Sequence, residues 1–274
     1  MLSNQTKYTK YKPKKRFGQN FLVDDNLARK IVRSLEIDDN DIVVEIGPGQ
    51  GALTKHLGVE AKKFIAVEID RNAVEKLTGE GYNVVSKSFL DFDFEKDIPS
   101  REANEKIKVI GNIPYNITSD ILFKLLDSKV KLDSCVLMVQ KEVAERLIAN
   151  ISTKQYGILA VQFQGLAEVK LLFHVPPTAF FPKPDVNSSV IRIKFGNEKY
   201  KVEDINVFKE FVRSAFSKRR KTLKNSLKNY FEKYKLDIKD FDLNFVRRAE
   251  TLTVGEFVEW SNFVAGKRKT SPPN

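Results

Sequence analysis

Three closely spaced glycines follow a short apolar run early in the chain and could hold a nucleotide-like ligand. Residues 42–46 are mainly apolar and β-branched, which is typical of a strand buried on both faces of a parallel sheet. Gly47, Gly49 and Gly51 then allow a tight turn, and a ligand can lie against backbone that carries no Cβ atoms. An apolar pattern at helical spacing resumes at Leu53. The stretch therefore predicts a strand, a glycine loop and a helix.

An acidic residue about 20 positions after this loop fits the same kind of ligand. Glu68 ends a second apolar run, residues 64–68, and a carboxylate at the end of the next strand can hold ribose hydroxyls. Gly47, Gly49 and Ala52 also satisfy the dinucleotide pattern G-x-G-x-x-A. These residues alone leave three interpretations open: an NAD site, an S-adenosylmethionine site, and a glycine turn without a ligand.

The next strand in the chain is also followed by an acid. Asp91 comes after the strand expected around residues 82–85, and its carboxylate could accept a hydrogen bond from an exocyclic amine such as adenine N6. Acids that follow successive strands gather over the carboxyl ends of an open α/β sheet, where such folds bind ligands. The alternative is an ordinary surface aspartate.

The residues that decide between the cofactors follow a fourth predicted strand, residues 108–111. Asn112 offers an amide oxygen, and Tyr115 offers a flat aromatic face. Pro114 removes a donor and favours an extended Ile113, whose carbonyl then stays out of a helix. Two acceptors beside a stacking surface fit an aromatic amine such as adenine N6. The alternative is a proline turn without a chemical role.

The chemistry of adenine N6 explains why such a turn is useful. The lone pair of this nitrogen is delocalised into the ring, so the amine is a poor nucleophile. Acceptors on both N–H groups pull the nitrogen toward tetrahedral geometry and stabilise the positive charge that develops as it attacks a sulfonium methyl group. Hydride transfer to NAD has no use for these acceptors. The turn therefore favours S-adenosylmethionine.

The distribution of charge predicts a polyanionic partner. The 274 residues carry a net charge of +11. Residues 1–22 hold six Lys or Arg and no acid, and residues 197–274 hold eighteen Lys or Arg against eleven Asp or Glu. Basic charge at both ends suits a phosphate backbone, although a solvated lysine-rich surface would look the same. The candidate RNA contacts are Lys14, Lys15, Arg16, Lys218, Arg219, Arg220 and Lys221.

Other patterns argue against a membrane, disulfide-stabilised or metal protein. No apolar run approaches the roughly 20 residues that span a bilayer. Cys135 is the single cysteine, so no intrachain disulfide can form. His56 and His174 are isolated from cysteine, and we expect no metal site. Together these features predict a cytoplasmic protein.

The chain divides into three expected parts. Residues 1–16 predict a basic flexible arm. Residues 17–197 alternate between strand and helix patterns and predict an α/β domain. Residues 198–274 contain only helical patterns and predict a small RNA-binding domain.

Three local patterns add detail to this division. A helix is expected to start at Lys218, and Thr253 with Glu256 should form a capping box ahead of another helix. Phe180 and Phe181 lie in a proline-braced loop. Because an exposed Phe needs a partner, we expect one of the pair to pack inward.

Five segments carry a family resemblance, in this order along the chain: Arg16-Phe-Gly-Gln-Asn-Phe-Leu, Glu45-Ile-Gly-Pro-Gly-Gln-Gly, Asn112-Ile-Pro-Tyr, Ala179-Phe-Phe-Pro-Lys-Pro-Asp-Val-Asn-Ser and Phe216-Ser-Lys-Arg-Arg-Lys-Thr-Leu-Lys-Asn. They resemble the ribosomal RNA adenine N6,N6-dimethyltransferases, most closely the KsgA type, and the match covers nearly the whole chain. The resemblance implies a class I, Rossmann-like methyltransferase fold that uses S-adenosyl-L-methionine. Its seven-stranded sheet should have an antiparallel last strand, and a small all-α domain should follow.

The resemblance also implies roles for individual residues. The implied cofactor contacts are Asn20, Leu22, Gly47, Gly49, Glu68, Asp91 and Asn112. Asn112 and the Ile113 carbonyl should hold the target N6, while Tyr115 and Phe180 should stack on the flipped base. Phe181 occupies what looks like a variable position of the family, so Phe180 is preferred for stacking.

The implied reaction is methyl transfer to N6 of two adjacent adenosines in the 3′-terminal hairpin of small-subunit (16S) ribosomal RNA, during ribosome biogenesis. The implied partner is that RNA within a small-subunit precursor, bound by a monomer. Asn187 stands where small-subunit enzymes more often carry Asp, and Ile113 is common in the related Erm enzymes, which act on large-subunit (23S) RNA. The alternatives are therefore an Erm-type enzyme and, from the basic ends, a mainly non-catalytic ribosome assembly factor.

Overall fold

The computed structural model describes residues 20–98, 102, 104–196, 199–218 and 220–270. The chain divides into two compact units, one built from residues 1–144 and 170–196, the other from residues 145–169 and 197–274. The second unit therefore contains a segment from the middle of the chain as well as the C-terminal part. No helix in the described ranges is long and apolar enough to cross a bilayer.

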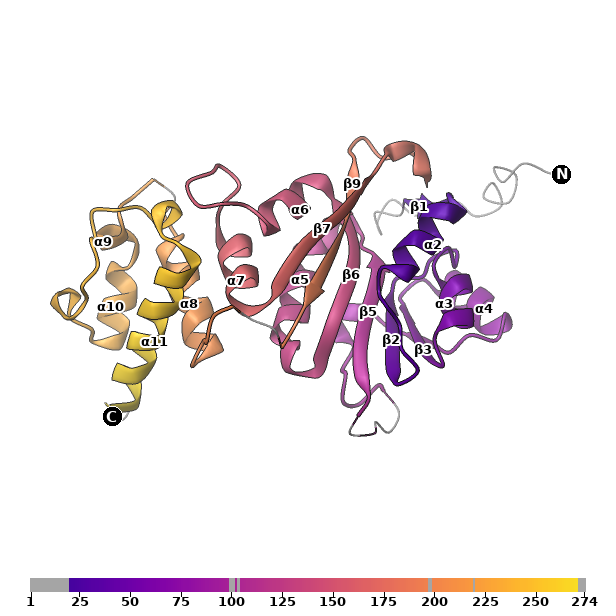
Figure 1. Ribbon diagram of the computed structural model, residues 1–274, viewed down its shortest axis with the longest axis horizontal. Helices are drawn as coiled ribbons and strands as arrows, with labels where there is room; N and C mark the ends of the chain where they lie inside the picture. The colour runs from indigo at the N-terminus through magenta and orange to yellow at the C-terminus, as the bar shows by residue number, and fades with distance from the viewer. Residues whose placement is uncertain (1–19, 99–101, 103, 197–198, 219, 271–274) are drawn as a thin grey trace. The chain divides into compact units, whose positions relative to one another are not determined.

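The first unit is organised around a seven-stranded sheet, with strand order β4-β3-β2-β5-β6-β9-β7 (Figure 1). The strands are β2 (Asp41–Ile46), β3 (Lys63–Glu68), β4 (Val84–Ser86), β5 (Lys106–Asn112), β6 (Leu132–Gln140), β7 (Glu168–Val175) and β9 (Ser188–Lys194). The pairs from β4 through β6 are parallel, and β9 runs antiparallel to β6. The predicted α/β fold with an antiparallel last strand is confirmed.

The central strand β2 is buried along its whole length, as its apolar run predicts. Two acids nevertheless lie in it, and each has a partner. Asp41 is 2.8 Å from the ammonium group of Lys108 on the neighbouring strand, and both side chains are buried. Glu45 accepts a hydrogen bond from Thr54. Partners of this kind are required because an unpaired buried charge is costly.

Helices of the first unit begin where strands end. They are α2 (Asp25–Arg33), α3 (Thr54–Glu60), α4 (Arg71–Gly79), α5 (Thr118–Asp127) and α6 (Lys141–Leu147), the last of which crosses into the second unit. Asp24 caps α2, because its side chain accepts from the backbone N–H groups of Asn26 and Leu27. The apolar faces of α2 and α3 pack in one cluster with the sheet residues Val43 and Ile110.

A separate two-stranded sheet joins two loops that lie far apart in the sequence. Strand β1 (Phe21–Leu22) pairs antiparallel with β8 (Phe180–Phe181), and Leu22 faces Phe180 across the pair. The backbone N–H of Val23 continues this contact by donating to the carbonyl of Ala179 at 2.8 Å. The pairing fixes the N-terminal loop of the described chain against the proline-braced loop.

The second unit is helical, with a core rich in aromatic rings. Its helices are α7 (Ile158–Leu166), α8 (Ile205–Ala215), α9 (Leu223–Ser226), α10 (Lys228–Tyr234) and α11 (Val254–Thr270). Phe211 and Phe257 meet edge to face with ring centroids 6.3 Å apart. The predicted capping box is confirmed, since Thr253 N–H donates to Glu256 at 2.8 Å and Glu256 N–H donates back at 3.1 Å.

The prediction that a helix starts at Lys218 is wrong. Helix α9 begins at Leu223, and the described cationic residues before it, Lys218, Arg220 and Lys221, lie in a turn. A helix N-terminus carries a partial positive charge, so a run of cations in its first turn is unfavourable. The apolar side chains that follow the cationic residues, Leu223, Leu227 and Tyr230, are buried.

Candidate active site

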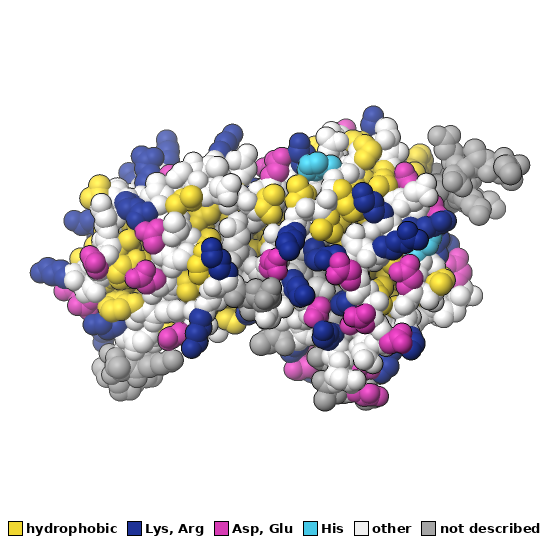
Figure 2. Space-filling view, viewed as in Figure 1, with side chains coloured by type: hydrophobic (Ala, Val, Ile, Leu, Met, Phe, Trp, Pro, Cys, Tyr) yellow, Lys and Arg dark blue, Asp and Glu magenta, His cyan; other side chains and the backbone are white. Residues whose placement is uncertain are grey.

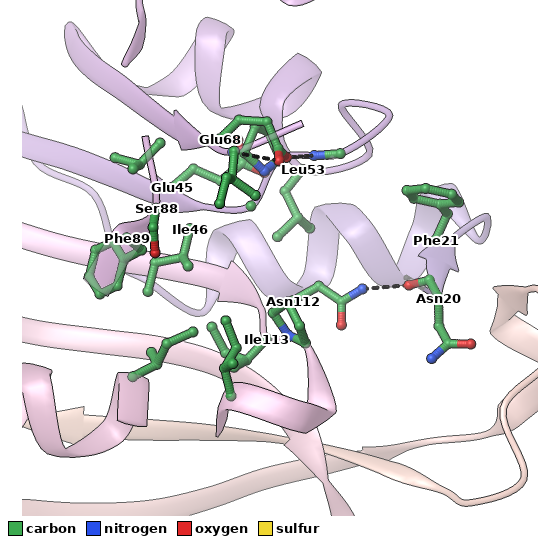
Figure 3. A pocket seen from close by; sticks show the side chains of 18 of the residues that line it. Asn20, Phe21, Glu45, Ile46, Leu53, Glu68, Ser88, Phe89, Asn112 and Ile113 are labelled. Carbon is green, nitrogen blue, oxygen red and sulfur yellow. Dashed lines mark hydrogen bonds between the residues drawn. The ribbon is translucent and has the colours of Figure 1, made fainter. Parts of the chain in front are cut away.

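A cavity of about 250 Å³ lies where β2, β3 and β5 end (Figure 3). The loop after β2, the end of β3, the turn after β5 and the N-terminal loop all contribute to its wall. The predicted site residues that line it are Asn20, Leu22, Gly47, Gly49, Glu68, Asn112, Ile113 and Tyr115. The structure therefore brings together residues predicted for the cofactor and residues predicted for the target base.

The glycine loop needs glycine for two physical reasons. Gly47 and Gly49 have φ angles of +60° and +54°, a region that side-chain-bearing residues seldom adopt. A Cβ atom on Gly49 would also lie 3.0 Å from the ring of Phe21. A Cβ on Gly47 would meet no atom of the described residues within 4 Å, so open space lies beside its backbone. The loop thus leaves room for a ligand against the main chain.

Glu68 is held in place by the backbone around it. One carboxylate oxygen accepts from Gly49 N–H at 3.0 Å, and the other accepts from the N–H groups of Ile69 and Asp70 at 2.8 Å. Burial raises the pKa of Glu68, and these three hydrogen bonds act in the opposite direction. The carboxylate is therefore oriented before any ligand arrives, as a group that holds ribose hydroxyls should be.

Glu45 is a second acid at the cavity, and the sequence prediction missed it. The side chain is 1% exposed and accepts from the Thr54 hydroxyl at 2.7 Å. Burial raises the pKa of Glu45 to about 8, with a smaller contribution from the charge of Glu68. The sequence does carry a signal for Glu45, because this acid stands within the apolar run of residues 42–46. Burial of a carboxyl that has no role would cost free energy.

The cavity suits a ligand that carries both positive and negative groups. The Glu68 carboxylate can accept from ribose hydroxyls, and its negative charge favours a ligand that also carries a cation. Glu45, whose pKa is raised to about 8 by burial, adds a carboxyl that is mostly protonated at neutral pH. Gln50 also lines the cavity, and its buried amide nitrogen has no hydrogen-bond partner among the described residues. A buried donor without a partner calls for an acceptor from the ligand. S-adenosylmethionine, with an amine, a sulfonium and a carboxylate, fits this set of groups.

Asp91 does not line the cavity. It ends the short 3-10 helix η2 (Phe89–Asp91), where its side chain is exposed, while Ser88 and Phe89 of the same segment line the wall. Strand β4 ends at Ser86, so the chain turns between the strand and this acid. The Asp91 side chain does not reach the cavity in this structure. A contact between Asp91 and the cofactor therefore stays a prediction.

The amide of Asn112 has a defined orientation. Its nitrogen donates to the backbone carbonyl of Asn20 at 2.8 Å. A carbonyl can only accept, so the NH₂ group must face Asn20 and the amide oxygen must point elsewhere. Figure 3 shows that oxygen directed away from Asn20, on the last residue of β5. The acceptor required by the predicted chemistry is therefore available.

The turn after Asn112 is fixed to the next strand. The Ile113 N–H donates to the Met138 carbonyl of β6 at 3.0 Å, and the Ile113 side chain is 1% exposed. Pro114 has φ −58° and ψ 132°, so the helix η3 (Tyr115–Ile117) starts only after it. The hydroxyl groups of Tyr115 and Ser188 lie 2.9 Å apart. Backbone and side chain thus both hold this turn.

The two adjacent aromatics behave differently. Phe180 is 4% exposed and packs in the core cluster with Leu22, whereas Phe181 is 41% exposed. The prediction that one of the pair packs inward is confirmed. Phe180 is not among the residues that line the cavity, because the β1–β8 pairing turns it toward the core. Stacking of Phe180 on a base stays a prediction and requires the loop to shift.

Four of the predicted RNA contacts, Lys14, Lys15, Arg16 and Arg219, lie outside the described residues. Lys218, Arg220 and Lys221 are exposed in the turn before α9. Figure 2 shows further Lys and Arg side chains over the helices of this unit. The described part of the chain contains no cluster of three or more His, Cys, Asp or Glu that could hold a metal ion.

Comparisons of the sequence with known proteins identify its relatives. Residues 10–266 match the family described as ribosomal RNA adenine dimethylase. A relative from Francisella tularensis, named ribosomal RNA small subunit methyltransferase A, is 41% identical over 259 residues, which is 93% of this chain and 99% of the relative.

Two solved structures share the fold. A dimethyladenosine transferase from Plasmodium falciparum is 25% identical, with a TM-score of 0.69 over 90% of this chain and 97% of the other. The 23S rRNA methyltransferase ErmE is also 25% identical, with a TM-score of 0.60 over 88% of this chain and 100% of the other. The sequence match over nearly the whole length decides the classification. The members of the matched family are S-adenosylmethionine-dependent methyltransferases, and this chain belongs to it: the ribosomal RNA adenine dimethylase family.

Proposed function

We propose that the protein transfers methyl groups from S-adenosylmethionine to N6 of two adjacent adenosines in the 3′-terminal hairpin of small-subunit (16S) ribosomal RNA. The observation that carries the chemistry is the amide oxygen of Asn112, which the Asn20 carbonyl holds in a fixed orientation beside the glycine-lined cavity. The observation that supports the small-subunit target is the 41% identity to a small-subunit enzyme along almost its entire length.

The residues of the cavity divide the work of binding and orientation. Glu68 would hold the ribose of the cofactor, the glycine backbone would lie beside its methionine part, and Gln50 would donate to its carboxylate. The cofactor supplies an electrophilic methyl group. The apolar part of the wall would limit the access of water to this group.

The target amine would be held at the turn after β5. Asn112 Oδ1 would accept from one N6 proton, and the Ile113 carbonyl would accept from the other. These acceptors favour the tetrahedral nitrogen and its developing positive charge in the transition state more than the planar amine of the ground state. Tyr115 would stack on the base once it has left the RNA helix, a step that costs a few kcal/mol. An N–C bond would form as the S–C bond breaks, the electron pair of that bond would stay on the sulfur of S-adenosylhomocysteine, and the N6 proton would pass to solvent water.

The cellular setting belongs to the same proposal. We place the reaction in the cytoplasm, on a precursor of the small ribosomal subunit, with the enzyme acting as a monomer during ribosome biogenesis. The basic residues Lys218, Arg220 and Lys221, together with Lys14, Lys15, Arg16 and Arg219, would contact RNA phosphates.

A side-by-side methyl-transfer assay tests the target. Purified protein and labelled S-adenosylmethionine are offered unmethylated small-subunit and large-subunit particles, and the label is mapped by mass spectrometry of nuclease fragments. We expect N6,N6-dimethyladenosine at two neighbouring positions near the 3′ end of the small-subunit RNA. Label confined to large-subunit RNA would favour an Erm-type enzyme, which the fold shared with ErmE also accommodates. An absence of transfer to either particle would contradict the proposal.

A further inference from the structure

A buried serine contacts the aromatic ring that would stack on the target base. The Oη atom of Tyr115 lies 2.9 Å from the Oγ atom of Ser188, within hydrogen-bond distance. Tyr115 lines the cavity and is half-buried, whereas Ser188 does not line it. The two residues are 73 positions apart in the sequence.

Ser188 is a rigid partner because of its place in the sheet. It is the first residue of β9, lies opposite Gln140 of β6, and is 0% exposed. Burial in a paired strand leaves its backbone no freedom to follow the tyrosine. Its hydroxyl therefore marks a fixed point to which the far end of the tyrosine ring is tied.

The neighbouring Ser189 provides a built-in comparison. It is also 0% exposed and lies opposite Val139, but successive side chains of a strand point to opposite faces. The Ser189 hydroxyl lies 2.8 Å from His174 Nδ1 instead. Two equally buried serines thus serve two different contacts, and only one of them is directed to the tyrosine at the cavity.

We propose that Ser188 is a positioning residue that sets the plane of the Tyr115 ring against the target adenine. The inference rests on the proposed function, since it assumes that a base stacks on Tyr115. The backbone of Tyr115 is held in the turn after Ile113, and the hydroxyl end of its ring is held by Ser188. A ring tied at both ends keeps one rotamer, which a productive stack requires.

Removal of this hydrogen bond should slow the reaction without weakening cofactor binding. A freed ring would sample other rotamers, so the base and its N6 would be aligned with Asn112 for less of the time. Ser188 lies outside the cavity wall, so the cofactor should not sense the change. We therefore expect a lower kcat on small-subunit particles and an unchanged Kd for S-adenosylmethionine.

A double-mutant cycle on the full-length protein tests the inference. Ser188→Ala and Tyr115→Phe each remove one hydroxyl, and each should lower kcat about fivefold, as the removal of one hydrogen bond would. The double variant should be no slower than either single variant, because both changes abolish the same interaction. Ser189→Ala is the matched control for burial in β9 and should keep the wild-type kcat.

Each other outcome has a defined meaning. A wild-type kcat in Ser188→Ala, or multiplied losses in the double variant, would overturn the inference. Equal losses in Ser188→Ala and Ser189→Ala would do the same, because they would trace the effect to strand packing. If Ser188→Ala fails to fold, an unchanged kcat in Tyr115→Phe decides against the inference. A wild-type protein that methylates neither particle would overturn the proposed function, and this inference with it.

Discussion

The two halves of the cavity are held by different means. On the cofactor side, backbone geometry does most of the work: glycines adopt positive φ, and three N–H groups orient Glu68. On the target-base side, side chains are tied to distant segments, with Asn112 bound to Asn20 and Tyr115 beside Ser188. The orientation of Glu68 should therefore tolerate changes in remote loops, whereas the orientations of Asn112 and Tyr115 depend on how those distant segments dock.

Removal of the Asn112 amide should give the largest effect and should separate the two halves. In Asn112→Ala the acceptor for N6 is absent, and kcat should fall about 100-fold or more, as for other groups that stabilise developing charge. The Kd for S-adenosylmethionine should change by no more than about threefold, since Asn112 is only one of the proposed cofactor contacts and most of the others lie on the glycine-loop side of the cavity. Steady-state rates and calorimetry measure both. A kcat near the wild-type value would refute the assigned role.

The buried acid of the cofactor half predicts a pH-dependent stability that the target half lacks. The pKa of Glu45 rises to about 8 on folding, from an ordinary value of 4.5, because of burial. The folded protein then binds more protons than the unfolded chain between these values, so stability falls as pH rises through that window. The slope from one group is at most about 1.4 kcal/mol per pH unit.

Glu45→Gln keeps the shape of the protonated acid. The variant should lose most of the pH dependence of stability that Glu45 causes. Melting temperatures between pH 5 and pH 8 provide the measurement. Glu68, whose pKa is also raised, adds to the slope with the same sign and remains in the variant. Asp25, whose pKa is lowered mainly by Lys55, titrates below the window and adds nothing to the slope there. Parallel curves for wild type and variant would contradict the protonation of Glu45.

A glycine substitution tests the backbone part of the cofactor half. Gly49→Ala should cost about 1 to 2 kcal/mol of stability, because the φ of +54° is strained for alanine and its Cβ would press on the Phe21 ring. Gly81→Ala is the control, since Gly81 has φ +90° but no atom of the described chain within 4 Å of the added Cβ.

Urea unfolding should therefore show a larger loss of stability for Gly49→Ala than for Gly81→Ala. Cofactor binding should weaken only in Gly49→Ala, because Phe21 also lines the cavity and would be displaced. Equal losses of stability in the two variants would mean that strain alone, and not the proximity of Phe21, requires glycine at position 49.

The smallest effect is expected from the exposed cations of the helical unit. Lys218, Arg220 and Lys221 replaced together by Gln should weaken RNA binding and reduce its salt dependence, by roughly 0.7 to 0.9 in logarithmic slope for each phosphate that the variant no longer neutralises. Filter binding at several salt concentrations measures this slope. Cofactor affinity should stay at the wild-type value. An unchanged slope would place the phosphate-binding surface on other residues.

The same contrast explains what could be predicted from sequence. The glycine loop and Glu68 form short local patterns, so their meeting at one cavity is predictable from spacing, although the spacing alone leaves the ligand open. In the target half the residue types of Asn112 and Tyr115 are informative, but their partners lie 92 and 73 positions away and leave no local trace. Strands of two residues, such as β1 and β8, are too short to show an alternating pattern.

Three further differences have physical causes of the same kind. Phe180 and Phe181 are chemically identical, so only the pairing of β1 with β8 decides which one is buried. The cationic run from Lys218 has helix-forming residue types, yet the charge at a helix N-terminus moves the start to Leu223. Glu45 is easily missed because it stands within an apolar run that resembles ordinary core.

The most direct test is a crystal structure of the protein with S-adenosylhomocysteine and adenosine bound together. We expect adenine N6 to lie within hydrogen-bond distance, about 2.7 to 3.2 Å, of both Asn112 Oδ1 and the Ile113 carbonyl. The N6 lone pair should point toward the sulfur of the cofactor product. An adenine ring bound with N6 turned away from Asn112, or excluded from that corner, would contradict the account.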